Sequence, residues 1–163
     1  MSPDELAQSW NNITPKLFGY LVNVLRDKAT AEDILQSTWM KALDALPRFR
    51  PRGAGLSAWL FAIARNECKQ HWRHENREVP LNPEIHDIPD HPSESLQDSI
   101  LIDQIFATMT EDDRELLRLR YITDLPLNDI ARILDINFVT VRVRIHRALT
   151  RARTLAIANT HHA

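Results

Sequence analysis

Residues 125–153 read LPLNDIARILDINFVTVRVRIHRALTRAR, and this stretch decides the fold of the C-terminal part of the chain. Apolar residues recur at three- and four-residue steps over 127–134 and again over 138–153, which predicts a short and a longer amphipathic helix. Residues 135–137 leave room only for a tight turn, and Asn137 is well placed as the N-cap of the second helix. The stretch therefore predicts a helix-turn-helix. Its shared core is expected from Ile130, Leu134, Ile136, Val141 and Ile145, and Ala131 is small where the two helices must cross closely.

The second helix of this motif is basic, with five arginines and no acidic residue between 138 and 153. A recognition helix lies in the DNA major groove with its N-terminal part facing base edges, and arginine pairs with guanine through two hydrogen bonds. Later arginines are better placed to contact phosphates. We therefore predict DNA binding, with a merely solvated basic face as the alternative. The candidates are Thr140, Arg142, Arg144, His146 and Arg147, followed by Arg151 and Arg153.

The remainder of the chain is also expected to be helical. Of its 163 residues 44% are apolar and only three are glycine, which favours an all-α fold. The first helix is expected over 3–24, with Pro15 as a potential interruption. Thr30 is the expected N-cap of the second helix, and Ser57 that of the third.

Two further signals mark the ends of elements. Pro47 ends the second helix, whose apolar stripe includes Leu43, and Thr110 with Asp113 resembles a capping box that opens a helix ahead of the motif. The full stripe of the second helix is Ile34, Leu35, Thr38, Trp39, Ala42, Leu43 and Leu46.

Charge and proline content divide the chain, although its net charge is only −2. Residues 1–77 carry eleven Lys or Arg, whereas residues 78–98 carry six acidic residues and no Lys or Arg. Four prolines between 78 and 95 preclude a continuous helix and predict an extended linker. About 20 extended residues span at most roughly 65–70 Å, close to the ~70 Å of two DNA turns. We predict domains at 1–77 and 96–155, joined by a linker at 78–95 and followed by a tail at 156–163.

A second basic surface is expected in the N-terminal part. Aromatic residues are interleaved with its cations, a combination suited to single-stranded or splayed bases. For Trp59 a role in the core is the favoured interpretation, whereas Phe49 and Trp72 are open. The basic residues are Arg48, Arg50, Arg52, Arg65, Lys69, Arg73 and Arg77.

Other functional classes find little support. There is no glycine-rich phosphate loop, no nucleophile elbow and no distinctive pair of carboxylates, so no enzyme or small-molecule substrate is expected. Cys68, His71 and His74 are too few for a structural zinc site, and no cofactor is expected. The single cysteine and the lack of a signal pattern or a long apolar run favour the cytosol.

Five strings in order resemble the extracytoplasmic-function (ECF) sigma factors, the minimal two-domain members of the bacterial sigma family. They lie within 17–77 and 96–153 and read AEDILQSTWMKAL, PRFRP, SAWLFAIARN, LLRLRYITDLPLNDIARIL and TVRVRIHRA. The resemblance implies a protein that binds core RNA polymerase and directs initiation at promoters. It implies an N-terminal helical bundle and a C-terminal helix-turn-helix domain.

The resemblance also implies protein partners. The helix bearing Asp33 and Gln36 would dock on the clamp helices of the largest catalytic subunit of polymerase, with Ser37 where the family usually has Glu. The flap of the other large subunit would provide a second contact. The acidic linker would run toward the RNA exit path. Many relatives are held inactive by an anti-sigma factor, which is an expected partner here.

Promoter DNA is the remaining partner that the resemblance implies. Asn66 would lie at the pocket for a flipped base of the −10 element, beside Gln70 where relatives often have Asp. Arg120 would support the DNA backbone near the −35 element, and Val143 stands where some members have Ser. The implied −10 residues are Arg48, Arg50, Arg52, Asn66, Lys69 and Arg73. The implied −35 residues are Arg120, Thr140, Arg142, Arg144, His146 and Arg147.

Two other functions fit part of the pattern. A conventional repressor or activator would bind duplex DNA through the C-terminal motif without polymerase, and would leave the N-terminal basic surface unexplained. A non-DNA interaction protein, such as a decoy for a sigma antagonist, would not support transcription with core enzyme.

Overall fold

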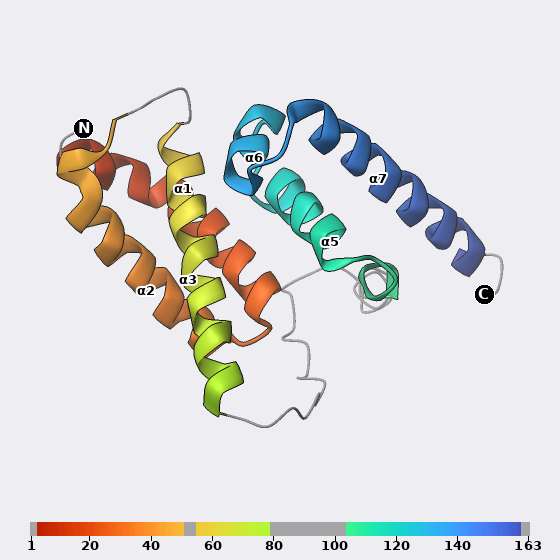
Figure 1. Ribbon diagram of the computed structural model, residues 1–163, viewed down its shortest axis with the longest axis horizontal. Helices are drawn as coiled ribbons and strands as arrows, with labels where there is room; N and C mark the ends of the chain where they lie inside the picture. The colour runs from red at the N-terminus through yellow and green to blue at the C-terminus, as the bar shows by residue number, and fades with distance from the viewer. Residues whose placement is uncertain (1–2, 51–54, 79–103, 161–163) are drawn as a thin grey trace. The chain divides into compact units, whose positions relative to one another are not determined.

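The computed structural model describes residues 3–50, 55–78 and 104–160, and all regular structure in these residues is helical (Figure 1). The expected all-α fold is therefore confirmed. The chain divides into two compact units, 1–89 and 90–163. The predicted linker after residue 78, Arg52 and the expected start of the C-terminal domain near residue 96 lie outside the described residues.

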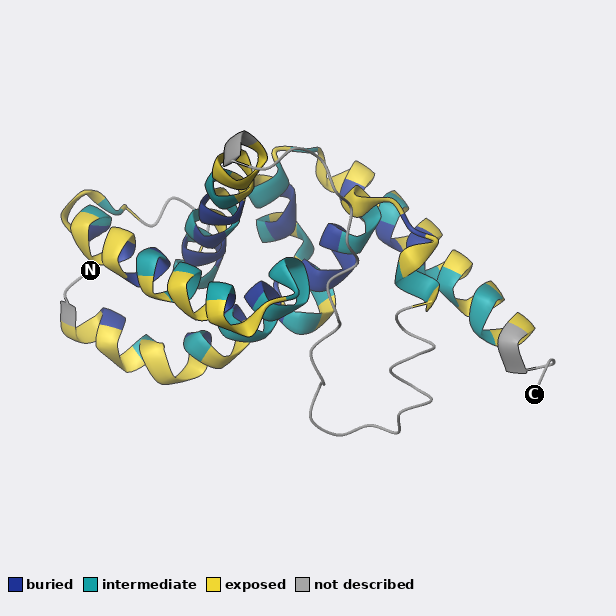
Figure 2. Ribbon diagram, turned by 90° about the horizontal axis from the view of Figure 1, so that it is seen from below, coloured by how far each residue is buried: buried dark blue, intermediate teal, exposed yellow. Residues whose placement is uncertain are grey.

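The first unit is a bundle of three helices, α1 (Pro3–Leu25), α2 (Lys28–Ala45) and α3 (Leu56–Glu78), in which each helix contacts the other two. A short 3₁₀ turn, η1 (Leu46–Arg48), follows α2. The buried residues lie on the sides of the helices that face one another (Figure 2). The largest side chains that are fully buried are those of Leu17, Tyr20 and Leu21 on α1, Thr38 on α2, and Leu60, Phe61 and Cys68 on α3, and Trp39 of α2 is 3% exposed.

Helix α1 runs through Pro15 without a break, so the interruption considered at that position does not occur. Proline lacks an N–H and leaves one backbone carbonyl of the preceding turn without its helical partner. The Pro15 side chain is exposed, as is the residue four positions earlier, Asn11. Water can therefore solvate that carbonyl, while Leu6, Ile13 and Leu17 bury the opposite face of the helix.

The predicted N-caps of α2 and α3 are both wrong. Asp27 caps α2, since its carboxylate accepts a hydrogen bond from the backbone N–H of Thr30 at 2.9 Å and another from the Thr30 hydroxyl. Thr30 therefore lies inside the first turn. Helix α3 begins at Leu56, and the N–H of Trp59 donates to the carbonyl of Gly55 at 3.2 Å, which places Ser57 within the helix.

The second unit contains α5 (Glu111–Leu117), a π-helical turn η2 (Arg118–Ile122), α6 (Leu127–Leu134) and α7 (Phe138–Thr160). Thr110 caps α5 as predicted, because its hydroxyl accepts a hydrogen bond from the N–H of Asp113 at 3.3 Å. Helices α6 and α7 begin where the sequence predicts, although α7 continues beyond residue 153.

The tight turn between α6 and α7 is confirmed in detail. Asp135 takes a left-handed conformation with φ of 53°, which Asp tolerates better than most residues. The next N–H, of Ile136, donates to the carbonyl of Ala131 at 3.0 Å. Asn137 then caps α7 by accepting a hydrogen bond from the N–H of Val139 at 2.7 Å. Ile130, Ala131, Val141 and Ile145 are buried between these elements.

Candidate nucleic-acid interface

The outward side of α7 borders a hollow of about 640 Å³ that gathers most of the predicted DNA-reading residues. Arg142, His146 and Arg147 line it from α7, and Arg120 lines it from η2. The apolar lining comes from Val139, Val143, Ile145 and Leu149 of α7 and from Leu127 of α6. Neither Arg142 nor Arg147 forms an ion pair with any residue that the structure describes, so both guanidinium groups are available to a ligand.

Arg120 has a structural contact inside the unit as well. Its Nη1 donates to the carbonyl of Leu125 at 3.0 Å, and the side chain is partly buried. This hydrogen bond ties η2 to the turn that precedes α6. Arg120 therefore positions the helix-turn-helix and presents the rest of its guanidinium at the edge of the hollow.

Two other predicted residues lie apart from this group. Arg144 pairs with Asp112 of α5 at 3.7 Å, as Arg151 pairs with Asp113 at 3.5 Å. Because successive helical residues are about 100° apart, Thr140 lies on the same side of α7 as Arg144. The structure thus places four of the six predicted −35 residues around the hollow, whereas Arg144 pairs with α5 and Thr140 lies on the same side of α7 as Arg144.

The basic surface of the first unit follows α3. Asn66, Lys69 and Arg73 are exposed and recur at helical steps of three and four, whereas Arg65 is partly buried. Trp72 is exposed beside Arg73. These side chains form a polar and cationic strip that an extended strand of nucleic acid can follow.

The segment after α2 is held against the start of α3 by aromatic stacking. The Phe49 and Trp59 ring centroids are 4.3 Å apart, and both rings are partly buried, so Trp59 is not a fully buried core residue. Arg48 is exposed. Arg50 folds back on its own loop, donating from Nη1 to the carbonyls of Pro47 and Phe49, each at 3.1 Å.

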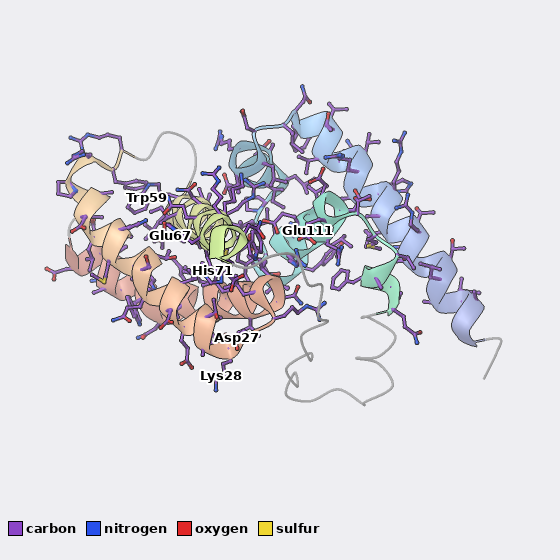
Figure 3. All side chains as sticks on the ribbon, turned by 60° about the horizontal axis from the view of Figure 1, so that its bottom comes forward. Asp27, Lys28, Trp59, Glu67, His71 and Glu111 are labelled. Carbon is purple, nitrogen blue, oxygen red and sulfur yellow. The ribbon has the colours of Figure 1, made fainter. Side chains whose placement is uncertain are left out.

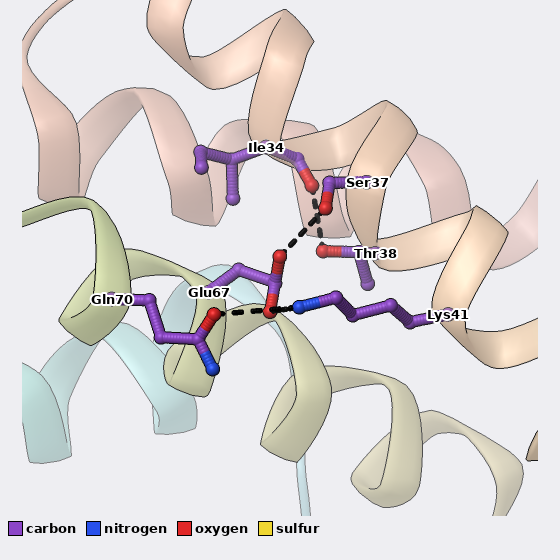
Figure 4. Close-up of polar contacts among 6 residues, drawn as sticks. All are labelled: Ile34, Ser37, Thr38, Lys41, Glu67 and Gln70. Atoms are coloured by element: carbon purple, nitrogen blue, oxygen red, sulfur yellow. Dashed lines mark hydrogen bonds and ion pairs between the residues drawn. The ribbon is translucent and has the colours of Figure 1, made fainter.

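A polar network links α2 to α3 and was not anticipated. Glu67 of α3 is only 6% exposed. Its carboxylate accepts a hydrogen bond from the Ser37 hydroxyl at 2.6 Å and forms an ion pair with Lys41 (Figure 4). Lys41 also approaches Gln70 at 3.4 Å. Figure 3 places Glu67 between Trp59 and His71 along α3.

The solvent side of α2 differs from its predicted pattern. Leu43 was expected in the apolar stripe of the core, but it is 50% exposed, and this expectation is wrong. Met40 is 61% exposed, and Asp33 and Gln36 are exposed as well. The four residues are spaced by three, four and three positions, so they share one face. This face has two polar and two apolar side chains.

Both units match regions of one protein family in the expected order. Residues 11–78 match sigma-70 region 2, and residues 99–151 match sigma-70 region 4. The chain belongs to the sigma-70 family. The two matches favour a sigma factor over a conventional repressor, because they assign both the N-terminal bundle and the helix-turn-helix to regions of the sigma-70 family.

Similar proteins place this sigma factor in the ECF group. It is 33% identical to the ECF RNA polymerase sigma factor SigC of Mycobacterium tuberculosis, over 78% of this chain and 70% of that protein. It is 24% identical to the ECF sigma factor SigM of Bacillus subtilis, over 95% of each. Among solved structures, the sigma factor RpoE of Bartonella quintana, in complex with the anti-sigma factor NepR, superposes with a TM-score of 0.73. That pair is 27% identical and covers 93% of this chain and 96% of the other.

The family assignment defines the activity. This sigma factor binds RNA polymerase and directs the initiation of transcription at promoters. Across the described ranges, no helix is long and apolar enough to cross a membrane. In the same residues, no three His, Cys, Asp or Glu side chains gather as they would to hold a metal ion, and Cys68 is buried in the core.

The sequence left two features of the sigma factor unidentified. Glu67 reaches Ser37 and Lys41 across 30 and 26 positions of sequence, and periodicity carries no information on such a distant pair. Met40 and Leu43 look like core residues in any pattern of apolar positions. The apolar positions around α2 are more numerous than one buried stripe can accommodate. This excess is the signal in the sequence that indicates a second contact face.

Proposed function

We propose that the sigma factor divides its work among three surfaces, of which the outward side of α7 reads the −35 element as duplex DNA. The observation that carries this proposal is the contrast among the arginines of one helix. Arg142 and Arg147 border the hollow without an ion pair in the described residues, whereas Arg144 and Arg151 face acids of α5. Arg142, near the helix N-terminus, is placed for base edges, and Arg147 is placed for phosphates.

The strip along α3 is proposed to bind and open the −10 element. Asn66, Lys69 and Arg73 supply an amide and two cations on one exposed side. Together with Arg48 and Arg50 before the helix, and with Arg52, they suit a strand whose bases have been separated. Gln70 contacts Lys41 and is partly buried, so it supports this strip rather than belonging to it.

The face of α2 formed by Asp33, Gln36, Met40 and Leu43 is proposed to dock on the clamp helices of polymerase. Exposed apolar side chains next to polar ones are typical of protein interfaces. Ser37, in place of the family's usual Glu, donates to Glu67 within the bundle. Serine at this position thus removes an acidic side chain that could contact polymerase, and it adds a hydrogen bond between α2 and α3. A second contact, to the flap of the other large subunit, is assigned to the C-terminal unit.

The remaining assignments follow from the family. We place the domains at 1–77 and 96–155, with the acidic segment 78–95 running toward the RNA exit path and 156–163 as a tail. An anti-sigma factor is a proposed partner, because RpoE of Bartonella quintana forms such a complex and shares this fold over nearly the whole chain. The protein works in the cytoplasm, where polymerase is found, as a non-catalytic initiation factor without a cofactor.

Arg142→Ala tests the assignment of α7. With purified core polymerase and the full chain, this variant is expected to bind a −35-containing promoter about tenfold more weakly, since one good contact to a base contributes roughly 1–3 kcal/mol. Its affinity for core polymerase is expected to be unchanged. Arg153→Ala, also exposed on α7 but about three turns further along, is the matched control, because loss of a phosphate contact there weakens binding to all duplexes alike and leaves the preference for the −35 sequence unchanged. A folded Arg142→Ala protein that loses core and promoter binding equally contradicts the assignment.

A further inference from the structure

The first two turns of α7 expose apolar side chains among the cations of the proposed −35 surface. Val139 is 63% exposed and Val143 is 41% exposed, and both line the hollow. Neither position is required by the core, which this helix supplies through Val141 and Ile145. An isolated exposed valine needs no explanation, but two of them at i and i+4 on a basic helix form a defined apolar contact.

The helix geometry puts these valines at the centre of the outward side. With about 100° per residue, Val139, Val143 and His146 lie within roughly 60° of one another and opposite the buried residues. Arg142 and Arg147 flank them on either side. The arrangement is an apolar centre between two arginines that form no ion pair in the described residues.

This combination specifies one occupant. Arg142 on one side suits a base edge and Arg147 on the other suits a phosphate, and the major groove of duplex DNA offers base edges bordered by phosphates. Valine has no side-chain donor or acceptor, so it cannot read the hydrogen-bonding pattern of a base edge. The apolar group among the base edges of the major groove is the C5-methyl of thymine.

We infer that Val139 and Val143 read thymine methyl groups in the −35 duplex. The inference rests on the proposed −35 role of α7 and deepens it. The −35 element of this sigma factor must then carry thymine, on one strand or the other, opposite the first two turns of α7. Relatives with serine at the position of Val143 lack this methyl contact and need not share the preference.

Replacing thymine with deoxyuridine tests the inference, because it removes the methyl group and leaves base pairing unchanged. Promoters are first selected with core polymerase and the full chain from duplexes with a randomised −35 region. Binding of the same holoenzyme is then compared on thymine and deoxyuridine versions. Loss of one buried methyl contact is expected to weaken binding about fourfold.

Three variants show whether the valines are responsible. Val139→Ala and Val143→Ala shorten exposed side chains on a helix, so neither leaves a cavity in the core. Each is expected to bind the thymine promoter more weakly and to lose its sensitivity to deoxyuridine at one position. Ile157→Ala, which alters an equally exposed apolar residue near the end of α7, is expected to keep the full fourfold effect.

The contrary results are distinct. A selected −35 element without thymine, or promoter binding that is indifferent to deoxyuridine, overturns the inference and leaves the −35 role of α7 standing. Valine variants that lose affinity for core polymerase instead identify the patch as a protein contact, which also overturns it. Failure to select any −35 sequence overturns the proposed function together with the inference.

Discussion

Among the described residues the first unit of the sigma factor buries one charged side chain, Glu67, and the second buries two, Arg118 and Glu115, and these charges are held in different ways. Glu67 of the first unit is bound by Ser37 and Lys41, which lie 30 and 26 positions away on another helix. Arg118 of the second unit, 3% exposed, pairs with Glu111 and Glu115, which precede it by seven and three positions. Glu67 joins two helices, whereas both of these acidic partners of Arg118 precede it in the same stretch of chain.

This difference matters for function because of where each charge lies. Glu67 directly follows Asn66, a proposed −10 residue, and its partners Ser37 and Lys41 lie on the helix proposed to dock on polymerase. The contact therefore fixes one functional helix relative to the other. Arg118 lies ahead of the helix-turn-helix, which is built from apolar packing and a turn at which Asn137 caps α7. The binding surfaces of the first unit are thus ordered by interactions between residues distant in sequence. Those of the second unit are ordered by interactions between residues close in sequence.

The largest expected effect sharpens the comparison at Arg118. Arg118→Ala leaves the nearly buried Glu115 without this charged partner, and removing one member of a buried pair costs about 3–5 kcal/mol of unfolding free energy. Urea unfolding of the full chain measures the lost unfolding free energy. Amide hydrogen exchange shows whether the loss of stability lies in α5 and α7. Arg132→Ala removes an exposed pair with Asp129 and is the control, with a cost below about 0.5 kcal/mol. Equal effects of both variants contradict a structural role for the buried charge.

A smaller effect is expected at Glu67. Glu67→Ala removes two interactions between α2 and α3, but Lys41 is about half exposed and can be solvated, so the expected cost is about 1–3 kcal/mol. Ser37→Ala removes one of these interactions and is expected to cost about 1 kcal/mol. Hydrogen exchange in α2 and α3 measures both.

The order of these two variants is the informative result. If Ser37→Ala costs as much as Glu67→Ala, the hydroxyl rather than the ion pair joins the helices. If neither variant changes protection in α2 and α3, the network does not stabilise the bundle and the comparison between the units fails.

The smallest effects are expected at the helix caps, where the two units behave alike. Asn137→Ala and Asp27→Ala each remove a side chain that accepts a hydrogen bond from the first turn of a helix, and each is expected to cost about 1 kcal/mol. Ser57→Ala is the control, because Ser57 lies inside α3 and caps nothing. Thermal unfolding of the three variants measures the difference, and a cost at Ser57 equal to that at Asp27 contradicts the observed start of α3.

The sequence predicts the second unit better than the first, and the physical reason is the range of the interactions. Thr110, Asn137 and the turn between α6 and α7 act on residues two to five positions away, so their effect can be recognised locally. The cap of α2 was misplaced because Asp27 and Thr30 are both good N-caps three positions apart. Leu43 was misplaced because periodicity identifies apolar positions but not what covers them. Glu67 was missed because its partners lie on another helix.

The candidate sites show the same limit. The sequence identifies the cations of α7, but only the fold separates Arg142 and Arg147, which border the hollow, from Arg144, which faces Asp112. The roles of the α2 and α3 residues come from the family resemblance, since an exposed polar face by itself indicates solvation as readily as binding.

Transcription in vitro tests the central claim most directly. Purified core polymerase, the full chain and fragmented genomic DNA are combined, and the starts of the transcripts are mapped. The account predicts discrete starts that depend on the protein and share two upstream elements about two DNA turns apart. With the Arg142→Ala variant, transcription is expected to depend less on the sequence of the upstream element farther from the start. No protein-dependent starts, together with tight binding of duplex DNA by the protein alone, would contradict it.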